Sequence, residues 1–238
     1  MDNSFVMTFD ADWAPDYIIE DLVELLNEYR VKGTLFCTDY FPNPSQYLET
    51  GIHPNFMPDS TQGDTVDAVI QNLLERASCR CVRTHRFFWY SDLLNIFAKY
   101  KILVDSSLYL PLQQYLQPSQ YKEIYRIPVW WSDNLHLEKE FTNIRSIDNF
   151  YAPGLKVLDF HPINIFYNTA SIKMRSHIYE DHKKNALVND KSFYNGNRLG
   201  IRDIFISFCN FINDFQLSSF FLSDFPLKTT SLYRQSPE

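Results

Sequence analysis

The strongest constraint on the fold of this chain is an alternation between short apolar runs and segments whose apolar residues recur at helical spacing. Apolar runs typical of strands occupy residues 4–9, 34–37, a stretch ending at 53, 81–84, 102–104, 124–131, 155–160 and 218–222. Helical spacing is found over residues 18–29, 66–77, 91–100 and 199–214. Strands that alternate with helices predict parallel pairing through crossover connections.

Seven or eight such units in 238 residues predict a closed or nearly closed α/β barrel that spans the chain as one domain. An open doubly wound sheet is the alternative, but no glycine-rich phosphate loop follows any of the strands. The aromatic and polar stretch over about residues 166–197 has no clear period. We interpret this stretch as an insertion or lid.

Charge and patterning exclude several classes of function. The formal net charge is −7, and the 22 basic residues form no stripe that could neutralise a run of phosphates, so we expect no nucleic-acid partner. No stretch approaches the roughly 20 apolar residues that span a bilayer, and the N-terminus lacks the pattern of a secretory signal. We therefore expect a cytosolic protein that begins at Met1, of unknown oligomeric state.

Acids, histidines and an arginine recur where these strands end. Asp10 and Asp12 end the first run, and the others, in chain order, are His53, Arg83, His85, Asp105, Asp159 and His161. In a parallel barrel the ends of the strands share one mouth, where the chemistry of such folds collects. Two carboxylates side by side repel one another unless a cation lies between them or they have different tasks. A solvated turn would explain Asp10 and Asp12 alone, but it does not predict the recurrence at successive strands.

These residues resemble the motifs of the polysaccharide deacetylases, the NodB-homology group of carbohydrate esterase family 4. The stretches that carry the resemblance, in chain order, are Thr8-Phe9-Asp10-Ala11-Asp12, Gly33-Thr34-Leu35-Phe36, Gly51-Ile52-His53-Pro54-Asn55-Phe56, Val82-Arg83-Thr84-His85 and Asp159-Phe160-His161-Pro162. They run in the family's order between about residues 5 and 224. The combination is similar to a divergent branch that is linked to surface-polysaccharide gene clusters.

The resemblance implies a distorted (β/α) barrel of about seven strands, a divalent metal, usually zinc, and hydrolysis of an N-acetyl group on an amino sugar. It also implies roles for individual residues. Asp10 matches the general base, Arg83 the arginine that pairs with the base, and His161 the general acid. Asp105 is a candidate to orient His161 or another imidazole, with a helix cap as the alternative.

The chain departs from the family pattern at two of the expected metal ligands. The ligand that normally follows the base directly is displaced by Ala11, so Asp12 is the candidate. His53 matches the first histidine ligand, but Met57 stands where the second belongs, and a thioether suits a hard hydrolytic centre poorly. We expect His85 to supply the third ligand, because imidazole suits zinc and His85 ends an adjacent strand. Asn55 and Asp59 are weaker candidates.

The leading functional prediction is a metal-dependent N-deacetylase acting on a sugar or glycan precursor. A hydrolase of another C–N bond, such as a cyclic amide, is a close relative of this idea. A non-catalytic carbohydrate-binding barrel and a purely structural partner are alternatives of another class. Aromatic side chains that could stack on sugar faces are Phe87, Phe88, Trp89, Tyr90, Trp130 and Trp131, with core packing as the alternative for most of them.

Overall fold

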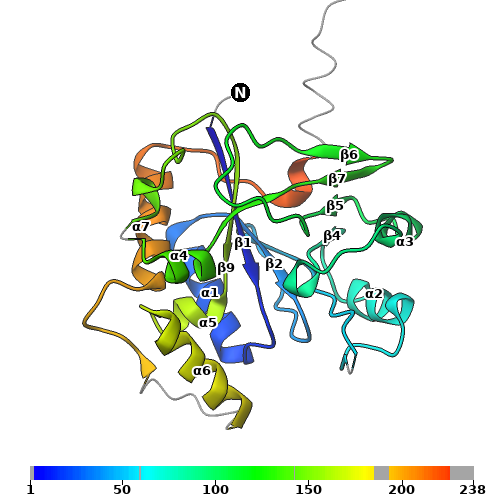
Figure 1. Ribbon diagram of the computed structural model, residues 1–238, viewed down its shortest axis with the longest axis horizontal. Helices are drawn as coiled ribbons and strands as arrows, with labels where there is room; N and C mark the ends of the chain where they lie inside the picture. Colours follow the sequence, from blue (N-terminus) through cyan, green and yellow to red (C-terminus); the bar gives the residue numbers. More distant parts are fainter. Residues whose placement is uncertain (1–2, 59, 142, 185–192, 226–238) are drawn as a thin grey trace, which may run out of the picture.

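The computed structural model describes residues 3–58, 60–141, 143–184 and 193–225. In this part of the chain, nine strands form one sheet and seven α-helices surround it (Figure 1). The strands are β1 Asn3–Asp10, β2 Gly33–Cys37, β3 Leu48–Ile52, β4 Cys81–Val82, β5 Val104–Asp105, β6 Ser119–Tyr121, β7 Ile124–Arg126, β8 Val129–Ser132 and β9 Gly154–Phe160. The helices are α1 Asp16–Tyr29, α2 Val66–Leu74, α3 Leu93–Lys99, α4 Asp133–Lys139, α5 Pro162–Phe166, α6 Ile172–Lys184 and α7 Ile201–Asp214.

The sheet curls into a distorted barrel. The strand order is β6-β7-β5-β4-β3-β2-β1-β9-β8, and neighbouring strands are parallel except for the pair β6 and β7. Strands β7 and β8 belong to one extended segment, which pairs with β5 in its first half and with β9 in its second half. Strands β5 and β9 lie on opposite sides of β1 in the sheet. The segment that holds β7 and β8 therefore connects the two sides and curls the sheet toward closure. The predicted barrel is confirmed, with nine strands in the described residues where about seven were expected.

Helices pack on the outer face of the barrel through the apolar stripes that the sequence predicted. Helices α1 and α7 lie on one side of β1, and α2 and α3 lie on the other (Figure 1). The buried face of α1 consists of Ile18, Ile19, Leu22, Leu25 and Leu26, which pack in one cluster with apolar residues of β1, β9, α5 and α7. Strand β1 is buried between its two neighbours, as a central parallel strand should be.

The strand pleat gives the barrel interior an apolar layer with a polar layer above it. Val6 on β1, Cys81 on β4 and Val157 on β9 belong to the same interior cluster. Side chains two or four residues further along a strand point to the same face. That alternation directs Asp10, Arg83 and Asp159 into the interior at the carboxyl end of the sheet, where each is buried.

The predicted strand at 218–222 is wrong, because this segment covers the opposite end of the barrel as a loop and a single-turn helix, η4 Leu222–Asp224. Leu222 N donates to Thr34 Oγ1 at 3.1 Å, and Ser223 N donates to Glu49 Oε1 at 3.2 Å. Phe220, Leu222 and Phe225 then pack on the interior apolar cluster. The residues of this run are apolar because they close one end of the barrel and pack on its interior, and not because they form a strand.

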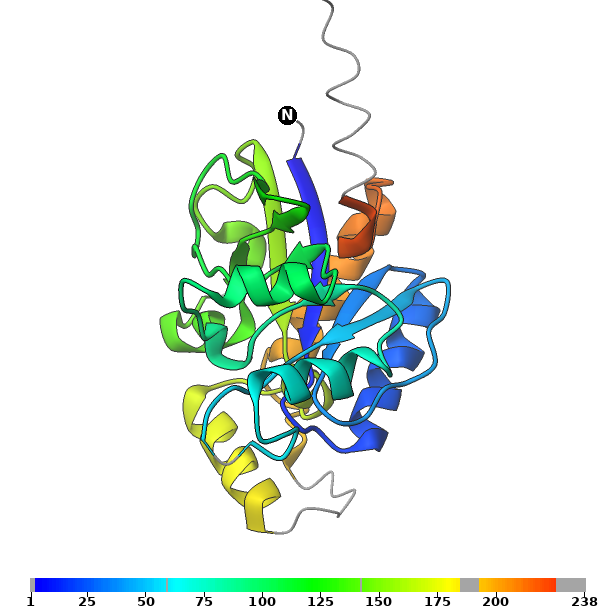
Figure 2. The ribbon, with the colours of Figure 1, turned by 90° about the vertical axis from the view of Figure 1, so that its right-hand side faces the viewer.

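The four predicted helices correspond to α1, α2, α3 and α7, whereas α4, α5 and α6 were not predicted. Helix α6 falls inside the predicted insertion or lid, of which residues 185–192 lie outside the described residues. Figures 1 and 2 both show α6 beside the end of the barrel at which β1 terminates. In the described part of the chain, no helix combines the length and the apolar character that crossing a bilayer requires.

Candidate metal and catalytic site

A cavity of about 640 Å³ lies at the carboxyl ends of the strands. Asp10, Asp12, His53, His85 and His161 all line it, so these five of the predicted strand-end residues share one mouth. Two unpredicted elements complete the wall, namely α4, through Asn134, Leu135 and Glu138, and α6, through Arg175 and Tyr179.

A turn after β1 explains how two carboxylates separated by Ala11 reach the same cavity. Ala11 N still donates to Phe36 O at 3.1 Å, so the ladder between β1 and β2 continues past Asp10. The chain then reverses, because Asp12 and Trp13 adopt left-handed conformations with φ of 44° and 57°. Trp13 N donates to Thr38 Oγ1 at 3.1 Å, which holds the turn. Asp10 therefore follows the strand pleat, whereas Asp12 enters the cavity from the turn.

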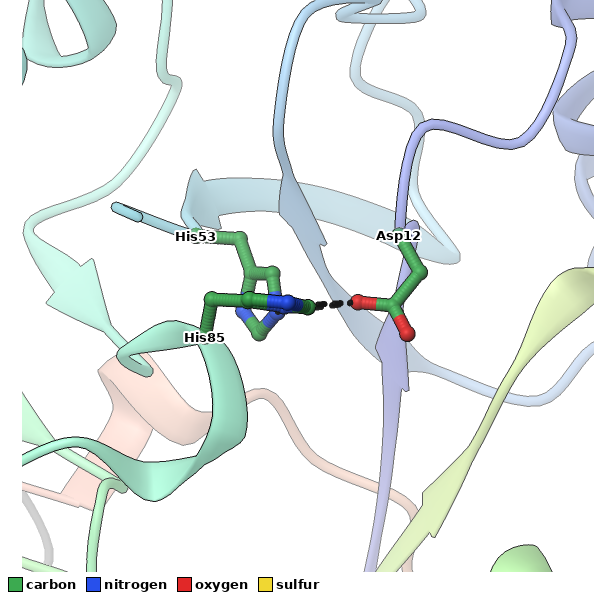
Figure 3. A group of neighbouring side chains, drawn as sticks. All are labelled: Asp12, His53 and His85. Atoms are coloured by element: carbon green, nitrogen blue, oxygen red, sulfur yellow. Dashed lines mark hydrogen bonds and ion pairs between the residues drawn. The ribbon is translucent and has the colours of Figure 1, made fainter. Parts of the chain in front are cut away.

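Asp12, His53 and His85 converge on one point (Figure 3). Asp12 Oδ1 lies 3.0 Å from His85 Nδ1 and 3.3 Å from His53 Nε2, and the two ring nitrogens are 3.3 Å apart. His53 follows β3 directly, and His85 begins the single-turn helix η1 His85–Phe87 after β4. The three donor atoms thus come from the carboxyl ends of three strands, β1, β3 and β4.

The spacing of these three atoms fits a small divalent cation. Zinc binds nitrogen and carboxylate oxygen at about 2.0–2.1 Å, so two ligand atoms at tetrahedral angles lie roughly 3.3 Å apart. The observed separations of 3.0 to 3.3 Å match that edge length. Burial alone would raise the pKa of Asp12, but hydrogen bonds with His53 and His85 outweigh it and hold this pKa well below its usual value. An ionised carboxylate and two imidazoles suit zinc, and their role as ligands stays a prediction.

Arg83 lies between two carboxylates in the polar layer. Its Nη1 donates to Asp10 Oδ1 at 2.9 Å and to Asp159 Oδ1 at 2.8 Å, and its other nitrogens bond to Ser106. The guanidinium is fully buried and also covers the Phe36 ring at 4.5 Å from the ring centre. Burial, and the negative charge of Asp10, raise the pKa of Asp159 well above its usual value, against the effect of Arg83. Arg83 therefore orients Asp10, and its contact with Asp159 was not predicted.

His161 is oriented by Asp133, which the sequence did not single out. Asp133 Oδ1 lies 2.7 Å from His161 Nδ1, and Asp133 Oδ2 accepts from His161 N at 2.8 Å. Burial disfavours the imidazolium, but the charge and hydrogen bond of Asp133 overcome this effect and raise the pKa of His161 to about 10. His161 Nε2 is on the cavity side, 3.5 Å from both Asp12 Oδ2 and Asn134 Nδ2. The arrangement favours a protonated His161 beside the candidate metal ligands.

The remaining candidates lie away from the cluster or bind elsewhere. Asp105 accepts hydrogen bonds from Arg126 Nε at 3.0 Å and Ser107 N at 2.9 Å, so it orients neither His161 nor another imidazole of the site. Asn55 lines the cavity, but its Oδ1 accepts from Met57 N at 3.1 Å. Asp59 lies outside the described residues. Residues 53–57 are not helical, so Met57 does not share a face with His53, and 39% of Met57 is exposed.

Of the six predicted sugar-stacking aromatics, two lie in the core and one lines the cavity. Trp130 and Trp131 are fully buried because β8 is covered on both faces, so the core-packing alternative holds for them and a role in sugar stacking is wrong. Phe87 lines the cavity and stacks on Tyr109 at 5.0 Å between ring centres. Trp13 and Tyr179 also line the cavity and were not predicted.

Comparisons with known proteins agree with this fold and with the predicted family. The sequence profile of the family described as WbmS-like polysaccharide deacetylase matches residues 7–183. The chain is similar to the crystal structure of a protein from Bordetella bronchiseptica described as a polysaccharide deacetylase involved in O-antigen biosynthesis. That match has 28% identity and a TM-score of 0.75, and it covers 87% of this chain and 89% of the other.

A peptidoglycan N-acetylglucosamine deacetylase shares the fold at 11% identity and a TM-score of 0.50, with 92% of this chain and 86% of the other covered. No protein with a curated functional description matches the chain. Since the family profile covers most of the chain, this protein belongs to the WbmS-like polysaccharide deacetylases. The predicted family resemblance is confirmed.

Proposed function

We propose that this chain is a metal-dependent N-deacetylase that removes an acetyl group from an amino sugar in a polysaccharide or glycan precursor. The observation that carries the proposal is the gathering of a base candidate, an acid candidate and a three-atom ligand cluster around one cavity. Binding of a sugar alone requires neither a base nor an acid. This gathering therefore favours catalysis over a non-catalytic carbohydrate-binding barrel.

Asp12, His53 and His85 are the residues that would hold the cation. A divalent ion such as zinc, when bound, lowers the pKa of a water molecule and stabilises negative charge that develops on the carbonyl oxygen. His53 can ligate through Nε2 if its proton is on Nδ1, a buried atom with no hydrogen-bond partner among the described residues. Asp10 Oδ1 is 3.9 Å from that atom and supplies negative charge on its side.

Asp10 is proposed to take the proton of the attacking water. Arg83 Nη1 fixes one oxygen of this carboxylate at 2.9 Å, which leaves the other oxygen to accept a proton. Asp10 is 5% exposed and lines the cavity, so a substrate that fills the mouth excludes bulk water from the proton transfer.

His161 is proposed to donate a proton to the leaving nitrogen of the amide. An amine is a poor leaving group until it is protonated, and a positioned imidazolium meets this need. Asp133 holds the ring through Nδ1, so Nε2 is the atom that faces the cavity and carries the transferable proton. Base and acid thus act from β1 and from the end of β9.

The substrate is proposed to be an N-acetylated sugar, which fits a cavity that is polar at its floor and aromatic on its walls. Trp13, Phe87 and Tyr109 line these walls and can cover the apolar face of a sugar ring. An amide in another kind of ring would meet the same catalytic groups, so substrate profiling is required to separate these two hydrolases.

Acetate release from a panel of N-acetyl sugars, free, nucleotide-linked and lipid-linked, tests the proposal. We expect Asp10→Asn and His161→Ala to reduce the rate by about 10²-fold or more, the usual scale for loss of a general base or acid, with metal content retained. Asp148→Asn and His177→Ala are matched controls, because both side chains are exposed and neither lines the cavity. Equal rates in wild type, Asp10→Asn and His161→Ala would exclude this mechanism.

A further inference from the structure

Helix α6 contributes an arginine and a tyrosine to the cavity wall that the proposed deacetylation does not use. Arg175 and Tyr179 are four residues apart on α6, so they lie on the same helical face, and both line the cavity. The Arg175 guanidinium covers the Tyr179 ring at 4.7 Å from the ring centre. The two side chains therefore form one unit that faces the site.

Each side chain of this unit has one buried polar atom without a hydrogen-bond partner in the described part of the chain. Arg175 Nε and Tyr179 OH are buried and make no hydrogen bond within the described residues. Buried polar atoms in folded proteins nearly always have a hydrogen-bond partner, and an unpaired one costs about 1–3 kcal/mol. The guanidinium also forms no ion pair with a described carboxylate, in contrast to Arg83 and Arg202. A ligand in the cavity can supply these missing partners.

The chemistry of the unit selects the partner. A guanidinium presents planar, paired N–H donors that match a carboxylate or a phosphate. Tyr179 adds a hydroxyl beside that fork, and its ring holds the guanidinium in place. The unit is also close to the reacting centre, since Arg175 and Tyr179 line the same cavity as Asp12 and His161. Arg86, another cation that lines the cavity, is exposed and therefore less able to select a charge.

We propose that Arg175 and Tyr179 form a subsite for an anionic group of the substrate, so that the preferred substrate is an N-acetylated sugar bearing a carboxylate or a phosphate. This inference rests on the proposed function for the identity of the sugar. It adds a subsite that fixes which sugars enter the cavity and which end of the sugar points to α6.

Equilibrium binding by isothermal titration tests the subsite without requiring turnover. The probes are N-acetylglucosamine, its 6-carboxylate analogue N-acetylglucosaminuronic acid, and N-acetylglucosamine 1-phosphate. We expect the wild type to bind one of the anionic probes at least tenfold more tightly than the neutral sugar. The anionic probe that binds more tightly shows whether the subsite prefers a carboxylate or a phosphate. Equal affinity for all three would overturn the proposal, whether or not acetate is released.

Variants assign the preference to α6. We expect Arg175→Gln to reduce the anionic-to-neutral affinity ratio by about 10- to 100-fold, the scale for a hydrogen-bonded charged pair, and Tyr179→Phe to reduce it by about 3- to 10-fold. Lys173→Gln is the matched control, because it removes the same charge from an exposed position of the same helix. A purely structural role for Arg175 would lower the melting temperature and leave the ratio unchanged, and that result would also overturn the proposal.

Discussion

The contact between Asp133 and His161 gives a sharp test of acid catalysis at this site. Asp133 Oδ1 is 2.7 Å from His161 Nδ1, and Asp133 Oδ2 accepts hydrogen bonds from His161 N at 2.8 Å and Asn164 Nδ2 at 3.0 Å. Asp133→Asn keeps the size of the side chain and removes its charge. We expect this variant to lose activity at alkaline pH, because the neutral amide no longer favours the imidazolium.

The magnitude follows from the lost charge. A hydrogen bond to a charged group contributes roughly 1.5–3 kcal/mol. Loss of the Asp133 charge should therefore shift the protonation equilibrium of His161 away from the imidazolium by about 10- to 150-fold. The pKa of His161 is raised to about 10 in the wild type, so its acid form persists through neutral pH. In Asp133→Asn the pKa falls, and the acid form is lost as pH rises above about 8. The rate at pH 9 relative to pH 7 should therefore drop several-fold in the variant only.

The assay is the rate of acetate release between pH 6 and pH 10, with melting temperature measured in parallel. Asp105→Asn is the matched control, because Asp105 is also a buried aspartate at a strand end but contacts Arg126. We expect Asp105→Asn to lower stability, since it weakens a buried ion pair, and to leave the pH profile unchanged. If the profile of Asp133→Asn overlays that of the wild type, Asp133 does not tune the acid.

Three further predictions test the site and the fold. His85→Ala should lose zinc in a titration, and adding Met57→His to it should not restore binding. Residues 53–57 are not helical, so a histidine at position 57 does not share a face with His53. Recovery of one ion per chain in the double variant would contradict this geometry. Leu222→Ala should lower the free energy of unfolding in urea by about 2–5 kcal/mol, because Leu222 is fully buried against the barrel interior, and a loss below about 0.5 kcal/mol would show that the plug is dispensable. The pKa of His161 is about 10 in the folded state and about 6.5 in the unfolded state, so protonation of His161 stabilises the fold fully when the pH is below about 6.5. This contribution to stability is lost as pH rises toward about 10. The stability difference between wild type and His161→Gln should shrink over that interval, and a constant difference would refute the linkage.

The sequence allowed the convergence of Asp12, His53 and His85 to be predicted because parallel strands end at a common mouth. Strand periodicity also directs Asp10 and Arg83 to the barrel interior. The turn at Asp12 and Trp13 could not be predicted, because left-handed backbone at a non-glycine residue depends on tertiary contacts such as the bond of Trp13 N to Thr38.

Asp133 was missed although a signal existed. Ser132 ends a strand and accepts from Leu135 N as a helix N-cap, which puts Asp133 at a strand end like the other site residues. Helix α6 was missed for a different reason. It turns polar side chains such as Arg175 and Tyr179 toward the cavity, so its sequence lacks the apolar stripe from which helices are recognised. The cytosolic location and the zinc identity stay predictions.

The proposed chemistry depends on a divalent cation held jointly by Asp12, His53 and His85. Elemental analysis of protein saturated with zinc and then dialysed tests it most directly, on wild type, Asp12→Ala, His85→Ala and the control His177→Ala. We expect about one zinc per chain in wild type and His177→Ala, and a large loss of zinc in both Asp12→Ala and His85→Ala. A wild type that retains no stoichiometric metal, or a His85→Ala variant that keeps a full equivalent, would contradict it.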